Sequence, residues 1–183
     1  MGRVVDSSRN QRGFTLIELI MTMVIMGILA AVGSSMISDT FSTARMVNAS
    51  QASADEARYA VERLAREIRE VKYVAGAYSI GSTMSPAATG MVFTRNIAGT
   101  DVTVTINKSG TNLTLGYSSP AVTSTLSSQV IGASDFTLRF LTITNSDTTF
   151  AGDVRFVVIT LKVTDATSGQ ATTQQTRVAL RNA

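Results

Sequence analysis

Few side chains in this 183-residue chain are of the types that carry out chemistry. There is no His, the commonest general base and metal ligand, and no Cys, which excludes disulfides, thiolate metal sites and Cys nucleophiles. Ser and Lys are present, but no motif pairs them, and no glycine-rich phosphate loop occurs. We therefore expect no catalytic residues, and we predict that the protein is not an enzyme.

One carboxylate stands in an unusual place. Glu18 is the only charged residue between Phe14 and Met36, and residues 19–38 carry no charge at all. A helix of about 20 residues is long enough to cross a bilayer. A carboxylate in such a segment is usually paired or functional, because inserting it alone costs about 3 kcal/mol at mid-bilayer. No partner for Glu18 is evident in the sequence.

Two ordinary interpretations of this segment remain open. Arg3, Arg9 and Arg12 precede it, as in a cleaved secretory signal, and small residues lie near its end at 30–35. The same pattern fits a simple membrane anchor whose N-terminus stays in the cytoplasm. Neither interpretation gives Glu18 a role.

The residues around Glu18 support a third interpretation. The following string resembles the processing motif of type IV prepilins and pseudopilins: Arg12-Gly13-Phe14-Thr15-Leu16-Ile17-Glu18-Leu19. The resemblance implies that a prepilin peptidase cuts between Gly13 and Phe14 and methylates the new amine of Phe14. It also implies that Glu18 pairs with the N-terminal amine of a neighbouring subunit during filament assembly. Such a pair is physically reasonable, because two buried charges that are each costly alone offset one another.

A helical pattern continues beyond the apolar run. Small and apolar residues repeat every three or four positions from Val47 to Val71, and the larger ones begin at Val61. We expect one helix from about Thr15 to about Val74, whose second half packs on a sheet. The charged residues on its other faces are expected in solvent: Arg58, Glu62, Arg63, Arg66, Glu67 and Glu70. Their four-residue spacings predict the pairs Glu62–Arg66, Arg63–Glu67 and Arg66–Glu70.

From Ala75 onward the pattern has the two-residue period of β-strands. Apolar and polar residues alternate in segments 102–106, 113–115, 136–140, 156–163 and 174–180. A phase slip after Phe140 predicts a bulge before Ile143, and apolar residues on both faces of 156–163 predict a central strand. The sequence therefore predicts an α+β fold, in which a long N-terminal helix packs on an antiparallel β-sheet head.

Four parts are expected along the chain. They are a cleaved leader at 1–13, a transmembrane and filament-core helix at 14–38, its amphipathic continuation at 39–75, and a β-rich extracytoplasmic head at 76–183. The expected location is the bacterial inner membrane, crossed once with the N-terminus in the cytoplasm. After assembly, the expected location is a pilus or pseudopilus filament.

No cofactor is expected, apart from one candidate site for Ca²⁺. The segment 144–153 contains Asp147 and Asp153, whose carboxylates are the kind of ligand that Ca²⁺ favours. The resemblance adds that some pseudopilins bind Ca²⁺ in a loop near the C-terminus. The alternative is a polar loop that uses Asn, Asp and Gly for its turn geometry.

The expected function is that of a minor pilin or pseudopilin in a type IV pilus-like filament. Residues 57–69 are similar to a segment of W-type and mannose-sensitive-haemagglutinin O-type minor pilins and of J-type minor pseudopilins. The implied partners are prepilin peptidase, other pilin subunits contacted through N-terminal helices, and the inner-membrane assembly platform. A J-like subunit of a type II secretion system and a membrane-anchored adhesive or DNA-uptake module remain alternatives. The net charge of +3 gives no reason to expect nucleic acid as a partner.

Overall fold

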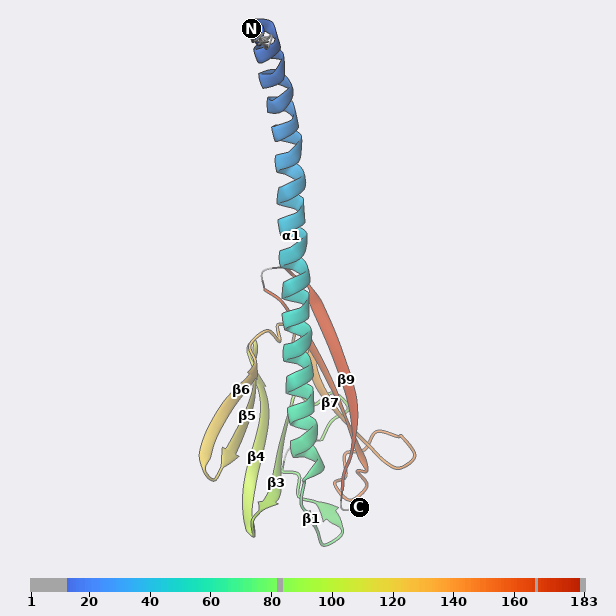
Figure 1. Ribbon diagram of the computed structural model, residues 1–183. Helices are drawn as coiled ribbons and strands as arrows, with labels where there is room; N and C mark the ends of the chain where they lie inside the picture. The colour runs from blue at the N-terminus through green and yellow to red at the C-terminus, as the bar shows by residue number, and fades with distance from the viewer. Residues whose placement is uncertain (1–12, 82–83, 167, 182–183) are drawn as a thin grey trace, which may run out of the picture. The chain divides into compact units, whose positions relative to one another are not determined.

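The computed structural model describes residues 13–81, 84–166 and 168–181 (Figure 1). The chain divides into two compact units, residues 1–45 and 46–183. The helix α1 (Leu16–Arg69) contributes its N-terminal part to the first unit and its C-terminal part to the second. The predicted leader, apart from Gly13, lies outside the described residues.

The first unit exposes its apolar side chains. Every described residue from Gly13 to Arg45 is exposed except Gly33, which is partly exposed. The helical hydrogen-bonding pattern continues without interruption through Gly27 and Gly33. By length and composition, α1 is able to cross a membrane. Among residues 13–45, the described part of the first unit, no side chain covers this apolar surface.

Hydroxyl groups in the apolar part of α1 are bonded within the helix itself. The Thr22 Oγ1 donates to the carbonyl oxygen of Leu19 at 2.9 Å, and the Ser35 Oγ donates to that of Val32 at 2.8 Å. Such bonds satisfy a polar side chain without water. These residues therefore enter an apolar surrounding with their donors already paired.

The second unit contains the nine strands of the described chain, all paired antiparallel. The strands are β1 (Tyr73–Val74), β2 (Ala77–Tyr78), β3 (Gly90–Ile97), β4 (Thr100–Ser109), β5 (Asn112–Ser118), β6 (Ala121–Ser127), β7 (Phe136–Leu141), β8 (Phe156–Thr164) and β9 (Ala171–Ala179). They form a pair β1-β2, a four-stranded sheet β3-β4-β5-β6 and a three-stranded sheet β7-β8-β9.

The two larger sheets flank the C-terminal part of α1, with β3 and β7 behind the helix and β6 and β9 at the outer sides (Figure 1). They meet where Ala88 exchanges hydrogen bonds with Leu138, at 2.8 and 3.2 Å. The two sheets thereby offer α1 a nearly continuous apolar surface. This confirms the predicted α+β fold with a long helix on antiparallel sheets.

The core of this unit lies between α1 and both sheets. Ala57, Ala60, Leu64 and Ile68 of the helix are fully buried, at the three- and four-residue spacing expected of one helical face. The strands contribute alternate residues, for example all the odd positions of β8 from Val157 to Val163. Because β8 lies between β7 and β9, it is the central strand that the sequence predicts.

Several element boundaries differ from the sequence-based expectations. Helix α1 ends at Arg69 rather than near Val74, because Val71 already bridges to Arg95 of β3 and the Lys72 amide donates to the Thr94 carbonyl at 2.8 Å. The bulge predicted before Ile143 is wrong. Strand β7 ends at Leu141, and Ile143 lies in the following turn, 75% exposed. Strands β3 and β6 were not expected.

We predict that Leu64→Ala lowers the free energy of unfolding of the second unit by about 3 kcal/mol, through lost apolar contact and the cavity that remains. All four tyrosines lie within residues 46–183, so tyrosine fluorescence of the full chain in detergent micelles during urea denaturation reports on this unit. Val122→Ala is the control, because Val122 is half-exposed and its truncation should cost less than about 0.5 kcal/mol. Equal effects of the two changes would contradict the packing described here.

Candidate functional site

Two residues of the motif, Thr15 and Glu18, cap the N-terminus of α1. Thr15 precedes the helix, and its carbonyl oxygen accepts the amides of Glu18 and Leu19 at 3.1 and 3.2 Å. The Glu18 amide also donates to the Thr15 Oγ1 at 3.4 Å, and the Thr15 hydroxyl faces the Glu18 Oε2 at 3.5 Å. A Thr followed three residues later by Glu is the sequence of a capping box. Thr15 is therefore a local partner of Glu18, which the three-residue spacing in the sequence could have indicated.

In this arrangement Glu18 has two independent roles, one in helix capping and one as an accessible carboxylate. As a capping residue it sits in the first turn of α1, where a negative charge interacts favourably with the helix dipole. As a carboxylate it remains accessible, because Glu18 and its neighbours are exposed. A contact at 3.5 Å to a hydroxyl is weak and does not neutralise the charge. The Glu18 carboxylate therefore stays free to bind a cation from another chain.

Gly13 and Phe14 precede the helix and have no regular secondary structure. A side chain on Gly13 would meet no atom within 4 Å, and Phe14 is 77% exposed. The peptide bond between them is thus in an exposed segment without regular secondary structure. Such a segment is accessible to an enzyme that acts on the backbone.

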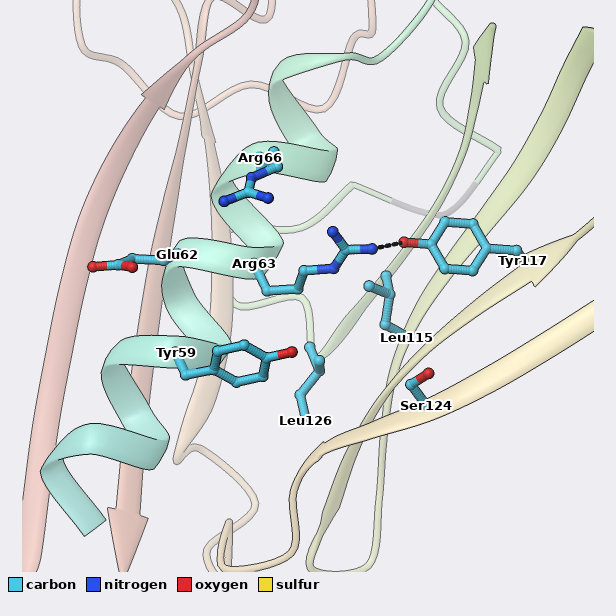
Figure 2. A pocket seen from close by; sticks show the side chains of 8 residues that line it. All are labelled: Tyr59, Glu62, Arg63, Arg66, Leu115, Tyr117, Ser124 and Leu126. Atoms are coloured by element: carbon cyan, nitrogen blue, oxygen red, sulfur yellow. Dashed lines mark hydrogen bonds between the residues drawn. The ribbon is translucent and has the colours of Figure 1, made fainter. Parts of the chain in front are cut away.

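A second cluster of ionisable groups lies in the second unit, between α1 and the sheet β3-β4-β5-β6. Glu67 is only 1% exposed, contrary to the expectation that it lies in solvent. Its carboxylate pairs with Arg63 at 3.1 Å and with Arg95 of β3. The Arg63 Nη2 also donates to the hydroxyl of Tyr117 on β5 at 2.7 Å (Figure 2). The cluster therefore connects one turn of α1 to the strands β3 and β5.

The position of Glu67 could have been recognised in the sequence. It follows Leu64 by three residues and precedes Val71 by four, so it lies on the apolar face rather than opposite it. A buried carboxylate needs partners. Arg63 was available at the favourable four-residue spacing, whereas Arg95 is distant in the sequence and is brought in by the sheet.

Of the three predicted helix pairs, Arg63–Glu67 is confirmed. The other two are wrong, because their carboxylates have different partners. Glu62 pairs with Arg58 at 3.1 Å, and Glu70 pairs with Arg181 at 3.4 Å. Among the residues that the structure describes, Arg66 consequently has no ion-pair partner. This unpaired guanidinium is exposed beside the cluster.

The Ca²⁺ candidates lie in and beside the turn after β7. The Asp147 carboxylate accepts two hydrogen bonds from Arg139, at 3.0 and 3.2 Å, while Asp153 is exposed. In the described part of the chain, no three or more His, Cys, Asp or Glu side chains lie close enough together to hold a metal ion by themselves. The Ca²⁺ site remains a prediction, in which Asp147 would have to exchange its arginine for the metal.

The comparison with known families adds one finding. Residues 8–34 match the family model of the prokaryotic N-terminal methylation motif, a span that includes Gly13, Phe14 and Glu18. The match supports a type IV pilin or pseudopilin that is processed by prepilin peptidase and assembles with other pilin subunits. It points to a structural subunit rather than an enzyme. Comparisons with curated proteins and with solved structures gave no significant match.

We predict that Glu67→Gln lowers the free energy of unfolding of the second unit by about 3 kcal/mol, because two guanidinium groups lose the carboxylate that compensates them. Urea denaturation followed by tyrosine fluorescence measures this. Glu70→Gln is the matched control, since its pair with Arg181 is exposed and is worth less than about 1 kcal/mol. A Glu67→Gln variant as stable as the control would show that the buried carboxylate is not needed.

Burial, together with the nearby Glu67 carboxylate, raises the pKa of Tyr117. A raised folded-state pKa means that the neutral phenol is favoured by folding. This contribution is complete below the ordinary tyrosine pKa of about 10 and is lost as the pH rises through the higher folded value. We therefore predict that the urea midpoint falls between about pH 9 and 11, and that it falls less in Tyr117→Phe. An unchanged pH dependence in Tyr117→Phe would contradict this assignment.

Proposed function

We propose that this protein is a structural subunit, a minor pilin or pseudopilin, of a type IV pilus-like filament. The observation that carries the proposal is the combination in the first unit of a methylation motif, an uncovered Gly13–Phe14 bond and an apolar helix whose Glu18 is unneutralised. Cleavage after Gly13 would make Phe14 the mature N-terminus and create an ammonium group. That cation would pair with the Glu18 carboxylate, which has no ion-pair partner among the described residues.

The pairing explains why a carboxylate is compatible with an apolar surface. Before assembly, Glu18 lies in the first turn of the helix, where the capping contact with Thr15 and the helix dipole favour its charge. After assembly, the surroundings are other apolar helices, and an unpaired carboxylate would be strongly unfavourable. The amine of a neighbouring Phe14 removes this penalty when the two helices are in the correct register.

The proposal includes a location and partners. The subunit is held in the bacterial inner membrane by residues 14–38, with the N-terminus in the cytoplasm and the head 76–183 on the other side. The Arg residues that precede the apolar segment favour this orientation. Prepilin peptidase removes the leader, the inner-membrane assembly platform receives the subunit, and neighbouring subunits cover its apolar helix.

Processing is tested by expressing the full chain in cells with and without a prepilin peptidase. We predict a shortened chain only where the peptidase is present, and no shortening in Gly13→Val, where a branched side chain stands at the proposed cleavage position. Shortening without the peptidase would instead indicate a secretory signal, and no shortening in any cell would indicate a simple anchor.

Three variants distinguish the proposed pairing of Glu18 with the Phe14 amine from its capping contact with Thr15. Gln can replace Glu in a capping box but cannot pair as an anion. We predict that Glu18→Gln and Glu18→Ala both reduce the amount of protein in sheared filaments by at least about tenfold, since an unpaired buried charge is strongly destabilising.

Thr15→Ala is the matched control for these variants. It removes the cap, at about 1 kcal/mol of helix stability, but keeps the carboxylate. We expect this variant to enter filaments in nearly normal amounts. Normal incorporation of Glu18→Gln would contradict the pairing and leave Glu18 with a local role in helix capping.

A further inference from the structure

The outer strand β6 presents an uncovered sheet edge. The inner edges of the two larger sheets are protected, since Val71 and Ile80 bridge to β3, and Ala88 and Asp147 bridge to β7. In the described part of the chain, the main chain of β6 bonds to β5 and to no other segment. An edge with unpaired N–H and C=O groups is a template for a further strand.

Strand β6 has few of the features that normally protect an edge. Its residues Ala121–Ser127 include no charged residue and no Pro, and the first five are exposed on both faces. The pairing irregularity lies near its end, opposite Leu113 and Thr114, so Ala121–Thr125 pair regularly with β5. The other outer strand, β9, carries the cationic Arg177 and two Gln residues. Of the two outer edges, β6 is therefore the better acceptor.

A groove runs between this edge and helix α1. Figure 2 shows Tyr59 and Arg63 of the helix opposite Leu126 and Tyr117 of the sheet, around a cavity of about 260 Å³. Apolar surface remains uncovered in and beside the groove: Tyr59, which lines it, is 61% exposed, and Val122, the neighbour of Tyr117 on β6, is 49% exposed. A strand added to β6 would direct every second side chain toward this groove.

The groove has an uncompensated positive charge. The carboxylates on this stretch of α1 already have partners: Glu62 has Arg58, Glu67 has Arg63 and Arg95, and Glu70 has Arg181. Arg66, which lines the groove, has no ion-pair partner among the described residues. An incoming segment with a carboxylate at one inward position would complement it, whereas a cationic one would be repelled.

We propose that the β6 edge and this groove form a strand-accepting site for an extended segment of another polypeptide, whose inward side chains are apolar with an acidic one among them. Its main chain pairs with β6, as in other cases of strand addition. Its apolar side chains cover Val122 and Tyr59, and its carboxylate pairs with Arg66. The site does not depend on the filament function proposed above.

The probe is a fluorescent seven-residue peptide, matching the length of β6, in which Thr alternates with Val, Glu and Val. A second peptide has Lys in place of Glu. Two further versions of the Glu peptide carry N-methyl groups on every second backbone nitrogen. In one version the methylated nitrogens lie on one edge of the strand, and in the other version they lie on the opposite edge. Binding to the full chain in detergent micelles is followed by fluorescence anisotropy.

We expect saturable binding of the Glu peptide and about fivefold weaker binding of the Lys peptide, the size expected for an exposed ion pair. Successive residues of a strand direct their N–H groups to opposite edges, so only one of the two N-methylated peptides should lose binding. Loss of binding in neither N-methylated peptide would overturn strand addition, as would the absence of saturable binding.

Charge reversal tests the assignment of Arg66. Arg66→Glu should reverse the preference, so that the Lys peptide binds more tightly than the Glu peptide. Arg69→Glu is the matched control, because Arg69 is also exposed on α1 but does not line this groove. The circular dichroism of both variants should equal that of the original chain. A preference that Arg66→Glu leaves unchanged, or that Arg69→Glu reverses equally, would overturn the role of Arg66.

Discussion

The main physical constraint on this protein is the apolar surface of α1, which no other described residue of the first unit covers. From Leu16 to Phe41 the large apolar side chains of α1 are exposed on all sides. Each Leu, Ile, Val, Met or Phe that is fully buried gains about 1.5–3 kcal/mol relative to water. Such a segment is therefore stable only when lipid or other chains surround it. A membrane before assembly and a bundle of similar helices after it both meet this requirement.

The same constraint explains why a charged residue at position 18 matters for assembly. A helix that is apolar on all sides does not determine its own rotation, or its register against a neighbouring helix, because one apolar contact is nearly equivalent to another. One carboxylate near the start of the helix breaks this equivalence, since it is stable only where a cation meets it. The Thr15 hydroxyl lies 3.5 Å from the Glu18 carboxylate, a weak contact that does not neutralise its charge. The second unit uses a buried carboxylate differently: Glu67 has both of its cations within the chain and fixes α1 on the sheet.

Much of this organisation follows from local sequence. Unbroken apolarity indicates a membrane helix, and alternation of apolar and polar residues in β4 and β5 indicates strands with one buried face. Apolar residues on both faces of β8 indicate its central position. Strand β6 was not evident because the polar residues Thr123, Ser124 and Thr125 follow one another in it, which leaves no apolar–polar alternation to detect. Strand β3 was missed as well, although Met91 and Phe93 are buried in it. The Glu67 cluster depends on Arg95, and only the folded sheet brings that residue close. Arg66 is unpaired among the described residues because Glu62 pairs with Arg58 and Glu70 pairs with Arg181. The four-residue spacing alone does not determine which of these pairs forms.

The central claim is that the chain reaches its apolar surroundings as a processed subunit whose first residue is Phe14. The most direct test is intact-mass and N-terminal peptide mass spectrometry of the protein from native membranes. The account predicts a chain that begins at Phe14 and carries one additional methyl group on its N-terminal amine. A chain that begins at Met1, or one that begins after about Gly33, would contradict it, because neither provides the amine that Glu18 requires.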